Sequence, residues 1–189
     1  MTDLVEEVVL VAGRDLVVRR PRDADALVDE QAFAPGEFLP YWAQLWPSGT
    51  ALAQAVAVRS LGGMRVVEVG CGLGLASLGA ALAGARVLAT DWSVEALELL
   101  EDNAAANGLA LETERADWTA PDGLLQRAPF DLVLAADVLY ERRAVAPLAA
   151  LLPRLGDEVL LADPGRPPLA AFLEQVGTVW SRPPLYRLR

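Results

Sequence analysis

The sequence predicts an α/β fold with a mostly parallel, seven-stranded sheet and helices on both faces. From Met64 onward, short and nearly continuous apolar runs alternate with segments of helical periodicity. This alternation is typical of parallel strands that are buried on both faces. Two final apolar runs flank Pro183 and Pro184, and they predict a C-terminal antiparallel hairpin.

The first 60 residues are expected to form an N-terminal β-hairpin and helices that precede the sheet. Pro47 can begin a helix without losing a hydrogen bond, because the first helical N–H has no partner within the helix. The expected elements are strands Val8–Val11 and Leu16–Val18, a helix over residues 21–32, and a helix from Pro47 to about Ser60.

Residues 61–189 are expected to form the core, so that residues 1–189 make a single domain, in keeping with the length of the chain. The expected strands are Arg65–Val69, Arg86–Thr90, Leu111–Arg115, Phe130–Ala135 and Glu158–Ala162. The expected helices are Leu75–Ala83, Val94–Asn107, Asp122–Gln126, Ala144–Leu152 and Pro168–Val176, and the terminal hairpin pairs Thr178–Arg182 with Leu185–Leu188.

The composition excludes several classes of function. The net charge is −10, all 16 basic residues are arginine, and the chain has no histidine. Without histidine, a triad with a histidine base and a His-ligated zinc site are both excluded. An acidic chain without a basic stripe is a poor candidate for binding nucleic acid. No apolar run reaches the ~20 residues that span a bilayer. From these three observations together, we expect no metal, nucleic-acid or membrane partner.

The single cysteine, Cys71, allows no intrachain disulfide. The first residues are acidic where a secretion signal would be basic. We therefore expect a cytoplasmic protein, and a monomer. Cys71 itself is expected to be a small residue tolerated in a turn and not a nucleophile.

The most informative motif follows the first core strand. Glu68 lies near the end of that strand, and Gly70, Gly72 and Gly74 form a turn that leads into a helix. Such a turn lets backbone N–H groups approach an anionic or carboxylate-bearing ligand. Asp91 ends the next strand, where a carboxylate can accept hydrogen bonds from a ribose. The motif therefore predicts a nucleoside-containing cofactor.

Two common nucleoside sites do not fit this turn. A dinucleotide-binding turn needs G-x-G-x-x-G/A, but the third position is Leu75 when counted from Gly70 and Ser77 when counted from Gly72. A phosphate-binding loop needs a lysine, and the chain has none. A nicotinamide site and a phosphate loop are both excluded.

The turn resembles the first motif of the class I, or seven-strand, S-adenosylmethionine-dependent methyltransferases, and the resemblance covers nearly the whole chain. It implies a Rossmann-like fold, S-adenosylmethionine as cofactor and S-adenosylhomocysteine as product. In that family the glycine turn passes under the methionine part of the cofactor, with an acid nearby, and the acid after the second strand holds the ribose. These cofactor-binding roles would fall on Glu68, Gly70, Gly72, Gly74 and Asp91.

Asp117 and Trp118 follow the third strand, at the family position beside the adenine. The acid or a neighbouring N–H would meet the exocyclic amine, and Asp117 is the stronger candidate, since Trp118 could be a core or rim aromatic. Trp46 or Trp42 is expected to border the cofactor pocket. Together with Tyr41, these side chains could instead fill the space under the N-terminal hairpin.

The fourth strand leads to the tetrad Asp137-Val138-Leu139-Tyr140 at the edge where open α/β sheets place reactive groups. This Asp-x-x-Tyr pattern resembles the seven-strand protein lysine methyltransferases, and differs from the Asn/Asp-Pro-Pro-Tyr/Phe of enzymes that methylate bases or glutamine amides. Residues 40–49 and 163–166 are similar to the branch that methylates the β subunit of electron transfer flavoprotein. The resemblance implies a protein substrate that presents a lysine.

Asp137 and Tyr140 are the expected catalytic residues. Asp137 can attract and orient an ammonium, and Tyr140 can supply a hydroxyl and an aromatic wall. Asp137 could instead cap a helix. Two other functions remain open: a small-molecule amine or pyridine N-methyltransferase, similar to nicotinamide methyltransferases, and a non-catalytic cofactor-binding module. The intact Asp137 and Tyr140 pair argues against the module.

Overall fold

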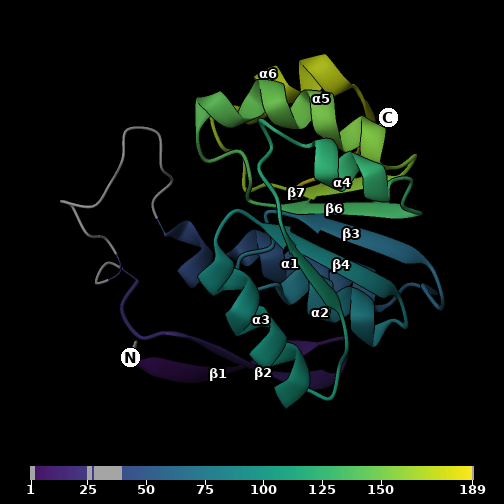
Figure 1. Ribbon diagram of the computed structural model, residues 1–189. Helices are drawn as coiled ribbons and strands as arrows, with labels where there is room; N and C mark the ends of the chain where they lie inside the picture. Colours follow the sequence, from purple (N-terminus) through teal and green to yellow (C-terminus); the bar gives the residue numbers. More distant parts are fainter. Residues whose placement is uncertain (1–2, 25–26, 28–39, 189) are drawn as a thin grey trace.

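A seven-stranded sheet with the order β5-β4-β3-β6-β7-β9-β8 forms the centre of the computed structural model, which describes residues 3–24, 27 and 40–188 (Figure 1). The strands β3 to β7 are parallel, and β9 is antiparallel to both of its neighbours. This arrangement confirms the predicted fold class. The strands are β3 (Arg65–Val69), β4 (Arg86–Asp91), β5 (Glu112–Arg115), β6 (Leu132–Ala136), β7 (Val159–Ala162), β8 (Thr178–Arg182) and β9 (Leu185–Leu188).

Helices cover both faces of the sheet (Figure 1). One face carries α1 (Pro47–Ala57), α2 (Leu75–Leu82) and α3 (Val94–Ala106), and the other carries α4 (Asp122–Arg127), α5 (Val145–Leu155) and α6 (Leu169–Val176). The short 3-10 helices η2 (Tyr41–Ala43) and η3 (Arg142–Ala144) lie in the connections. Within the described ranges, no helix has both the length and the apolar character that crossing a membrane requires.

Alternate residues of the central strands enter two separate apolar layers. In β3, Val66 packs in the layer of α1 and α2, whereas Val67 and Val69 pack in the layer of α5 and α6. In β6, Leu134 and Val133 divide between the same two layers. All five side chains are fully buried. Because both faces are apolar, these strands appear in the sequence as continuous hydrophobic runs, which is why their positions could be predicted.

Several boundaries differ from the prediction. The helix α1 ends at Ala57 and not near Ser60. The helix α5 passes the expected end at Leu152 and continues through Pro153 to Leu155. A proline in the last turn removes one backbone hydrogen bond, and the full burial of Leu155 provides the contact that offsets this loss.

Two further expectations concern single segments. Phe130 was expected to begin a strand, but it forms only an isolated bridge with Gly156, and β6 begins at Leu132. Most of the helix expected over residues 21–32 lies outside the described residues, and Pro21 is the last residue of a strand.

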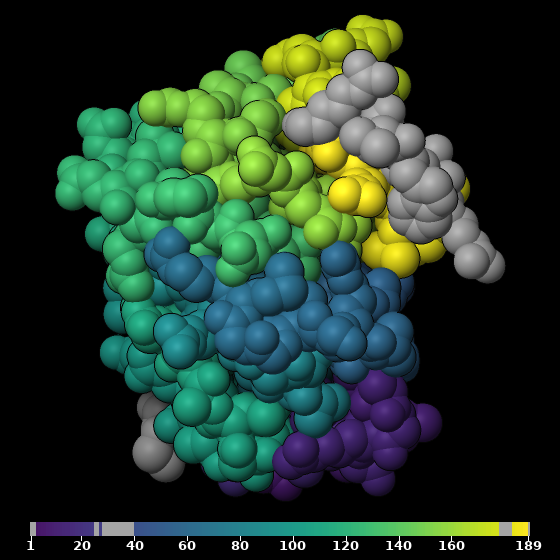
Figure 2. All heavy atoms as spheres, turned by 90° about the vertical axis from the view of Figure 1, so that its right-hand side faces the viewer, coloured from purple at the N-terminus to yellow at the C-terminus, as the bar shows by residue number. Residues whose placement is uncertain are grey.

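The N-terminal hairpin is present, with strands β1 (Leu4–Val11) and β2 (Arg14–Pro21). Both residues of its turn have positive φ, 50° at Ala12 and 82° at Gly13. Positive φ at both positions is what a type I′ turn requires, and the twist of this turn matches the twist of the two strands. In both overall views the hairpin lies at the opposite end of the molecule from the C-terminal strands (Figures 1 and 2).

Two asparagines of α3 attach the hairpin to the core. Asn103 accepts from the Arg19 N–H at 2.8 Å and donates to the Arg19 carbonyl at 3.0 Å. Asn107 binds the N–H and the carbonyl of Val17 in the same way, at 2.9 and 2.7 Å. Each side-chain amide therefore pairs with one residue of β2 as a neighbouring strand would. Unpaired backbone groups at this partly buried edge would be costly.

We expect Asn103→Ala to lower the free energy of unfolding by about 2 kcal/mol, because it leaves the N–H and the carbonyl of Arg19 without their partner. Urea unfolding of the variant and the wild type measures the loss. Asp102→Ala, at the exposed neighbouring position of α3, is the matched control and should change stability by less than about 0.5 kcal/mol. Equal effects of the two substitutions would show that the asparagine does not hold the hairpin.

Candidate active site

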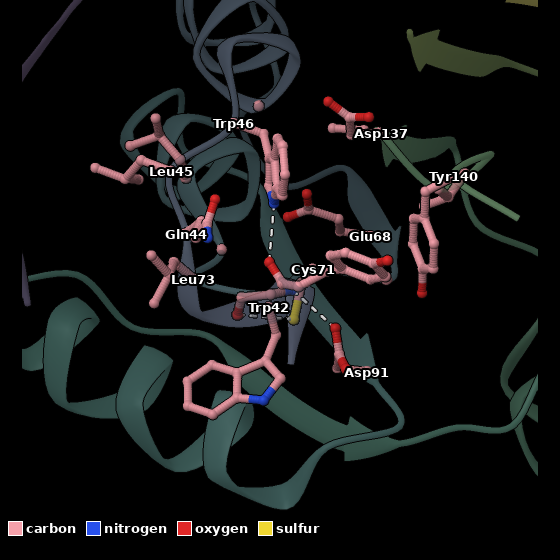
Figure 3. Close-up of a pocket in the computed structure, with 18 of the residues that line it drawn as sticks. Trp42, Gln44, Leu45, Trp46, Glu68, Cys71, Leu73, Asp91, Asp137 and Tyr140 are labelled. Atoms are coloured by element: carbon pink, nitrogen blue, oxygen red, sulfur yellow. Dashed lines mark hydrogen bonds between the residues drawn. The ribbon is translucent and has the colours of Figure 1, made fainter. Parts of the chain in front are cut away.

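A hollow opens beyond the carboxyl ends of β3, β4 and β6, and encloses about 760 Å³ when the part open to solvent is included (Figure 3). This is the edge at which open α/β sheets bind ligands. Nine of the ten predicted site residues line it: Glu68, Gly70, Gly72, Gly74, Asp91, Trp118, Asp137, Tyr140 and Trp46.

The turn that forms the floor of the hollow requires its glycines. Gly70, Gly72 and Gly74 have φ angles of 70°, 52° and 72°, a backbone conformation that residues with a side chain rarely adopt. A Cβ at Gly70 would lie 2.9 Å from the Trp118 ring, and one at Gly72 would lie 3.2 Å from the Trp42 carbonyl. The turn therefore brings bare backbone close to the hollow.

Glu68 fastens the turn from below. Its Oε2 accepts from the Ser77 N–H at 2.7 Å and from the Ser77 hydroxyl at 2.5 Å, which joins the end of β3 to the first turn of α2. The pKa of Glu68 is raised to about 8, mainly by burial; the bonds from Ser77 act in the opposite direction, and the charge of Asp91 adds to the rise. At neutral pH the Glu68 carboxyl is therefore largely protonated.

Asp91 fastens the same turn from the side of β4. Its Oδ2 accepts from the Gly72 N–H at 2.8 Å, and its Oδ1 accepts from the Ser93 N–H at 3.1 Å. The side chain is 4% exposed, and burial raises the pKa of its carboxyl. A carboxylate oxygen can accept more than one donor, so these bonds leave it able to take part in ligand binding.

Of the two residues expected beside the adenine, one lines the hollow and the other does not. The Trp118 ring lines the hollow and lies against Gly70. Asp117 is exposed and is not among the lining residues; its Oδ1 accepts from the N–H and the hydroxyl of Thr119 at 2.8 and 2.7 Å, which lowers its pKa. A role of Asp117 at the adenine stays a prediction.

The two tryptophans that precede α1 orient their rings differently. Trp42 lines the hollow, but its indole points away from the centre and packs with the apolar residues under the hairpin (Figure 3). The Trp46 ring faces the hollow, and its Nε1 donates to the Tyr41 carbonyl at 2.8 Å. Both tryptophans therefore border the hollow, and Trp42 also fills space under the hairpin, while a role of either in cofactor binding stays a prediction.

Asp137 and Tyr140 form the other end of the hollow. Asp137 has a positive φ of 58°. Among the described non-glycine residues, only Ala12 in the hairpin turn also has a positive φ. Such conformations occur often at functional sites. No helix begins directly after Asp137, since η3 starts at Arg142, so Asp137 is not a helix cap.

The Tyr140 ring lies 4.7 Å from the Tyr41 ring, between centroids, with a tilt of 53°. Burial raises the pKa of Tyr140, and the negative charge of Asp91 adds to the shift. The phenol therefore stays protonated and keeps its hydrogen for donation. Together the two rings form an aromatic wall beside Asp137.

Cys71 is only 7% exposed, and burial, together with the charges of Asp91 and Glu68, raises the pKa of its thiol. A thiol that is held in its neutral form is a poor nucleophile. These properties suit the small turn residue that the sequence predicts.

Arg166 lines the hollow, and sequence reasoning did not identify it as a site residue. Its Nε donates to Oδ1 of Asp137, forming an ion pair across 29 residues of sequence. In the sequence, the only signal for Arg166 was the resemblance of residues 163–166 to one methyltransferase branch. This resemblance does not indicate which side chain Arg166 contacts.

Residues 42–161 match a family model described as lysine methyltransferase, and this span is more than half of the chain. The chain belongs to the lysine methyltransferase family. The family uses S-adenosylmethionine, which is the cofactor that the sequence predicts. The resemblance drawn from the glycine turn and the Asp137 tetrad is thereby confirmed.

Two relatives illustrate the similarity. The electron transfer flavoprotein beta subunit lysine methyltransferase of Xenopus laevis is 34% identical over 136 residues, which cover 67% of this chain and 53% of the relative. The ribosomal protein L11 methyltransferase of Pseudomonas fluorescens is 36% identical over 113 residues, which cover 59% of this chain and 35% of the relative. The match thus spans about half of the length of the first relative and about a third of the length of the second.

Among solved structures, a 16S rRNA methyltransferase from T. thermophilus in complex with AdoMet and guanosine superposes with a TM-score of 0.66. The match covers 100% of this chain and 50% of that chain, at 17% sequence identity. At this identity the likeness shows a shared fold.

Replacing Glu68 with glutamine should flatten the pH dependence of stability. A carboxyl whose pKa rises from 4.5 to about 8 on folding binds more protons in the folded state between these values, so the free energy of unfolding falls as pH rises through this window. Glu68 can contribute a slope of about 1 kcal/mol per pH unit. Urea unfolding at several pH values within the window measures the slopes of the two proteins.

Glu174→Gln, at an exposed position of α6, controls for the loss of one acidic residue and should keep the slope of the wild type. If the Glu68→Gln and wild-type curves run parallel through the window, Glu68 does not change its protonation on folding.

Gly74→Ala should destabilise the protein more than Gly63→Ala. Both glycines have positive φ, 72° and 78°, but a Cβ at Gly74 would lie 2.2 Å from Leu100 Cδ1, whereas one at Gly63 would meet nothing within 4 Å. Gly63→Ala should cost about 1 kcal/mol of backbone strain, and Gly74→Ala should cost about 1–3 kcal/mol more because the core must move. Equal losses in urea unfolding would contradict the close approach at Gly74.

Proposed function

We propose that this protein is an S-adenosylmethionine-dependent methyltransferase that acts on lysine side chains of a protein substrate. The observation that supports this most is that one hollow holds both the glycine turn and the Asp137–Tyr140 tetrad. The turn fits a methyl donor, and the tetrad provides the groups that an amine acceptor needs.

The residues at the glycine turn fit the cofactor. Bound S-adenosylmethionine supplies a methyl group carried on a positively charged sulfur. The bare backbone at Gly70 and Gly72 would accommodate its methionine end, Asp91 would accept from the ribose, and Trp118 would cover the adenine. Glu68, largely protonated, would add little repulsion against the carboxylate of the cofactor. The molecule has no phosphate, so the absence of lysine is no obstacle.

The residues at the other end would receive the acceptor. A lysine amine attacks only when it is neutral, although its ordinary pKa is about 10.4. The Asp137 carboxylate would attract and orient the ammonium, and the wall formed by Tyr41 and Tyr140 would favour a cation and restrict its position. Since the chain has no histidine, a carboxylate or water would take the proton.

A protein acceptor is supported by the names of the relatives, which are methyltransferases of electron transfer flavoprotein beta subunit and of ribosomal protein L11. The net charge of −10 also favours a basic acceptor surface through long-range attraction. We therefore propose a protein, and not a small amine, as the substrate.

The experiment that tests this function is transfer of radiolabelled methyl groups into a lysate of the source organism from which the gene has been deleted. We expect label in one or a few proteins, with methyl-lysine found by mass spectrometry. Label in RNA, in a small molecule or on another side chain would overturn the proposed acceptor. Binding of S-adenosylmethionine in a calorimeter without any labelled product would indicate a non-catalytic module.

Asp137→Asn should reduce methyl transfer by at least about 100-fold while S-adenosylmethionine still binds, because the substitution removes the charge that orients the acceptor. Calorimetry measures cofactor binding, and label incorporation measures transfer. Asp157→Asn, at an exposed position before β7, should leave both unchanged. Wild-type turnover in the Asp137 variant would exclude the role given to this carboxylate.

A further inference from the structure

Asp137, the carboxylate assigned to the acceptor, already holds a cation. The Arg166 Nε donates to Asp137 Oδ1, and the guanidinium carbon lies 5.4 Å from the centre of the Trp46 ring. This distance is within the range of a cation–π contact. The Asp137 side chain is 5% exposed and that of Arg166 is 26% exposed. A positive group therefore sits between a buried carboxylate and an aromatic face.

The backbone beneath Arg166 is fixed, whereas its guanidinium is not enclosed. Asp163 is fully buried, and its Oδ1 accepts from the N–H groups of both Gly165 and Arg166 at 2.7 Å each. These bonds hold the start of the side chain against the end of β7. Among the described residues, the guanidinium is held by the Asp137 ion pair and the Trp46 ring, and the charge of Asp163 also attracts it. Rotation of the side chain toward solvent would break the ion pair and the ring contact.

An incoming ammonium would need the same carboxylate, Asp137. A carboxylate and an aromatic face are the partners that bind a positively charged nitrogen. Asp137 is almost completely buried, so two cations side by side on it would repel each other with little water to screen them. Figure 3 places Trp46 and Asp137 at the same end of the hollow, across from the glycine turn.

We propose that Arg166 occupies the site of the acceptor ammonium and leaves it when the acceptor binds. This inference rests on the proposed function, because it takes the acceptor to be an amine. Arg166 is then a specificity-determining residue. A free amine must displace the guanidinium with the energy of one ion pair, whereas a protein substrate can add contacts outside the hollow. The need to displace Arg166 from Asp137 therefore favours large acceptors over small amines.

Sinefungin tests this without a known acceptor. In this analogue of S-adenosylmethionine a carbon that bears an amine replaces the sulfonium and its methyl group, so the positive charge of the amine faces the acceptor site. S-adenosylhomocysteine has no charge there and serves as the reference ligand. Calorimetry would give the affinity ratio of the two ligands for the wild type and for each variant.

Arg166→Ala should raise the affinity for sinefungin relative to S-adenosylhomocysteine by about tenfold, because the competing cation is gone. Addition of guanidinium ion at millimolar concentration should bring the ratio back toward that of the wild type. Arg166→Lys, which keeps a cation, should stay near the wild type. Arg142→Ala, at an exposed position of η3, should not change the ratio.

The double variant Asp137→Asn/Arg166→Ala should lose the gain, because no carboxylate remains to attract the amine. An unchanged or lower ratio in Arg166→Ala, with S-adenosylhomocysteine still bound, would overturn the role of Arg166 and leave the proposed function intact. Failure of the wild type to bind S-adenosylhomocysteine would overturn both.

Discussion

Two buried acidic side chains hold the glycine turn through hydrogen bonds, and the arrangement of the hollow depends on these bonds. Glu68 ties the end of β3 to Ser77 in α2, and Asp91 ties the end of β4 to the Gly72 N–H. A turn of three glycines has little conformational preference of its own, so it needs such bonds to keep one shape. The hydrogen bonds are strong because little water competes for them.

The same arrangement sets the electrostatics of the site. Glu68, Asp91 and Asp137 are all buried beside one hollow. Protonation of Glu68 and the ion pair between Asp137 and Arg166 both reduce the negative charge that burial would otherwise make costly. A site of this kind suits a cofactor with a positive sulfur, and an amine that must arrive as a cation and react as a neutral base.

The sequence could predict those parts of the fold that depend on local pattern. Val66 and Val67 belong to a run that is apolar on both faces, so β3 was placed correctly, and Asp91 was recognised because it follows such a run. Helix ends were less predictable. Leu155 keeps α5 helical beyond Pro153 through a contact with the core, and no local signal reports that contact.

By itself the sequence determined the fold class, through alternating apolar runs and helical segments, and it located the glycine turn and the Asp137 tetrad, because each depends on residue types at fixed short spacings. The identity of the cofactor followed from the resemblance of these motifs to a known family. Only the tertiary structure decided which side chains share the hollow. It turned the Trp46 ring toward the hollow, packed the Trp42 indole under the hairpin, and placed Arg166 against Asp137. These contacts join segments that are distant along the chain, and their geometry follows from how β6, β7 and α1 pack together.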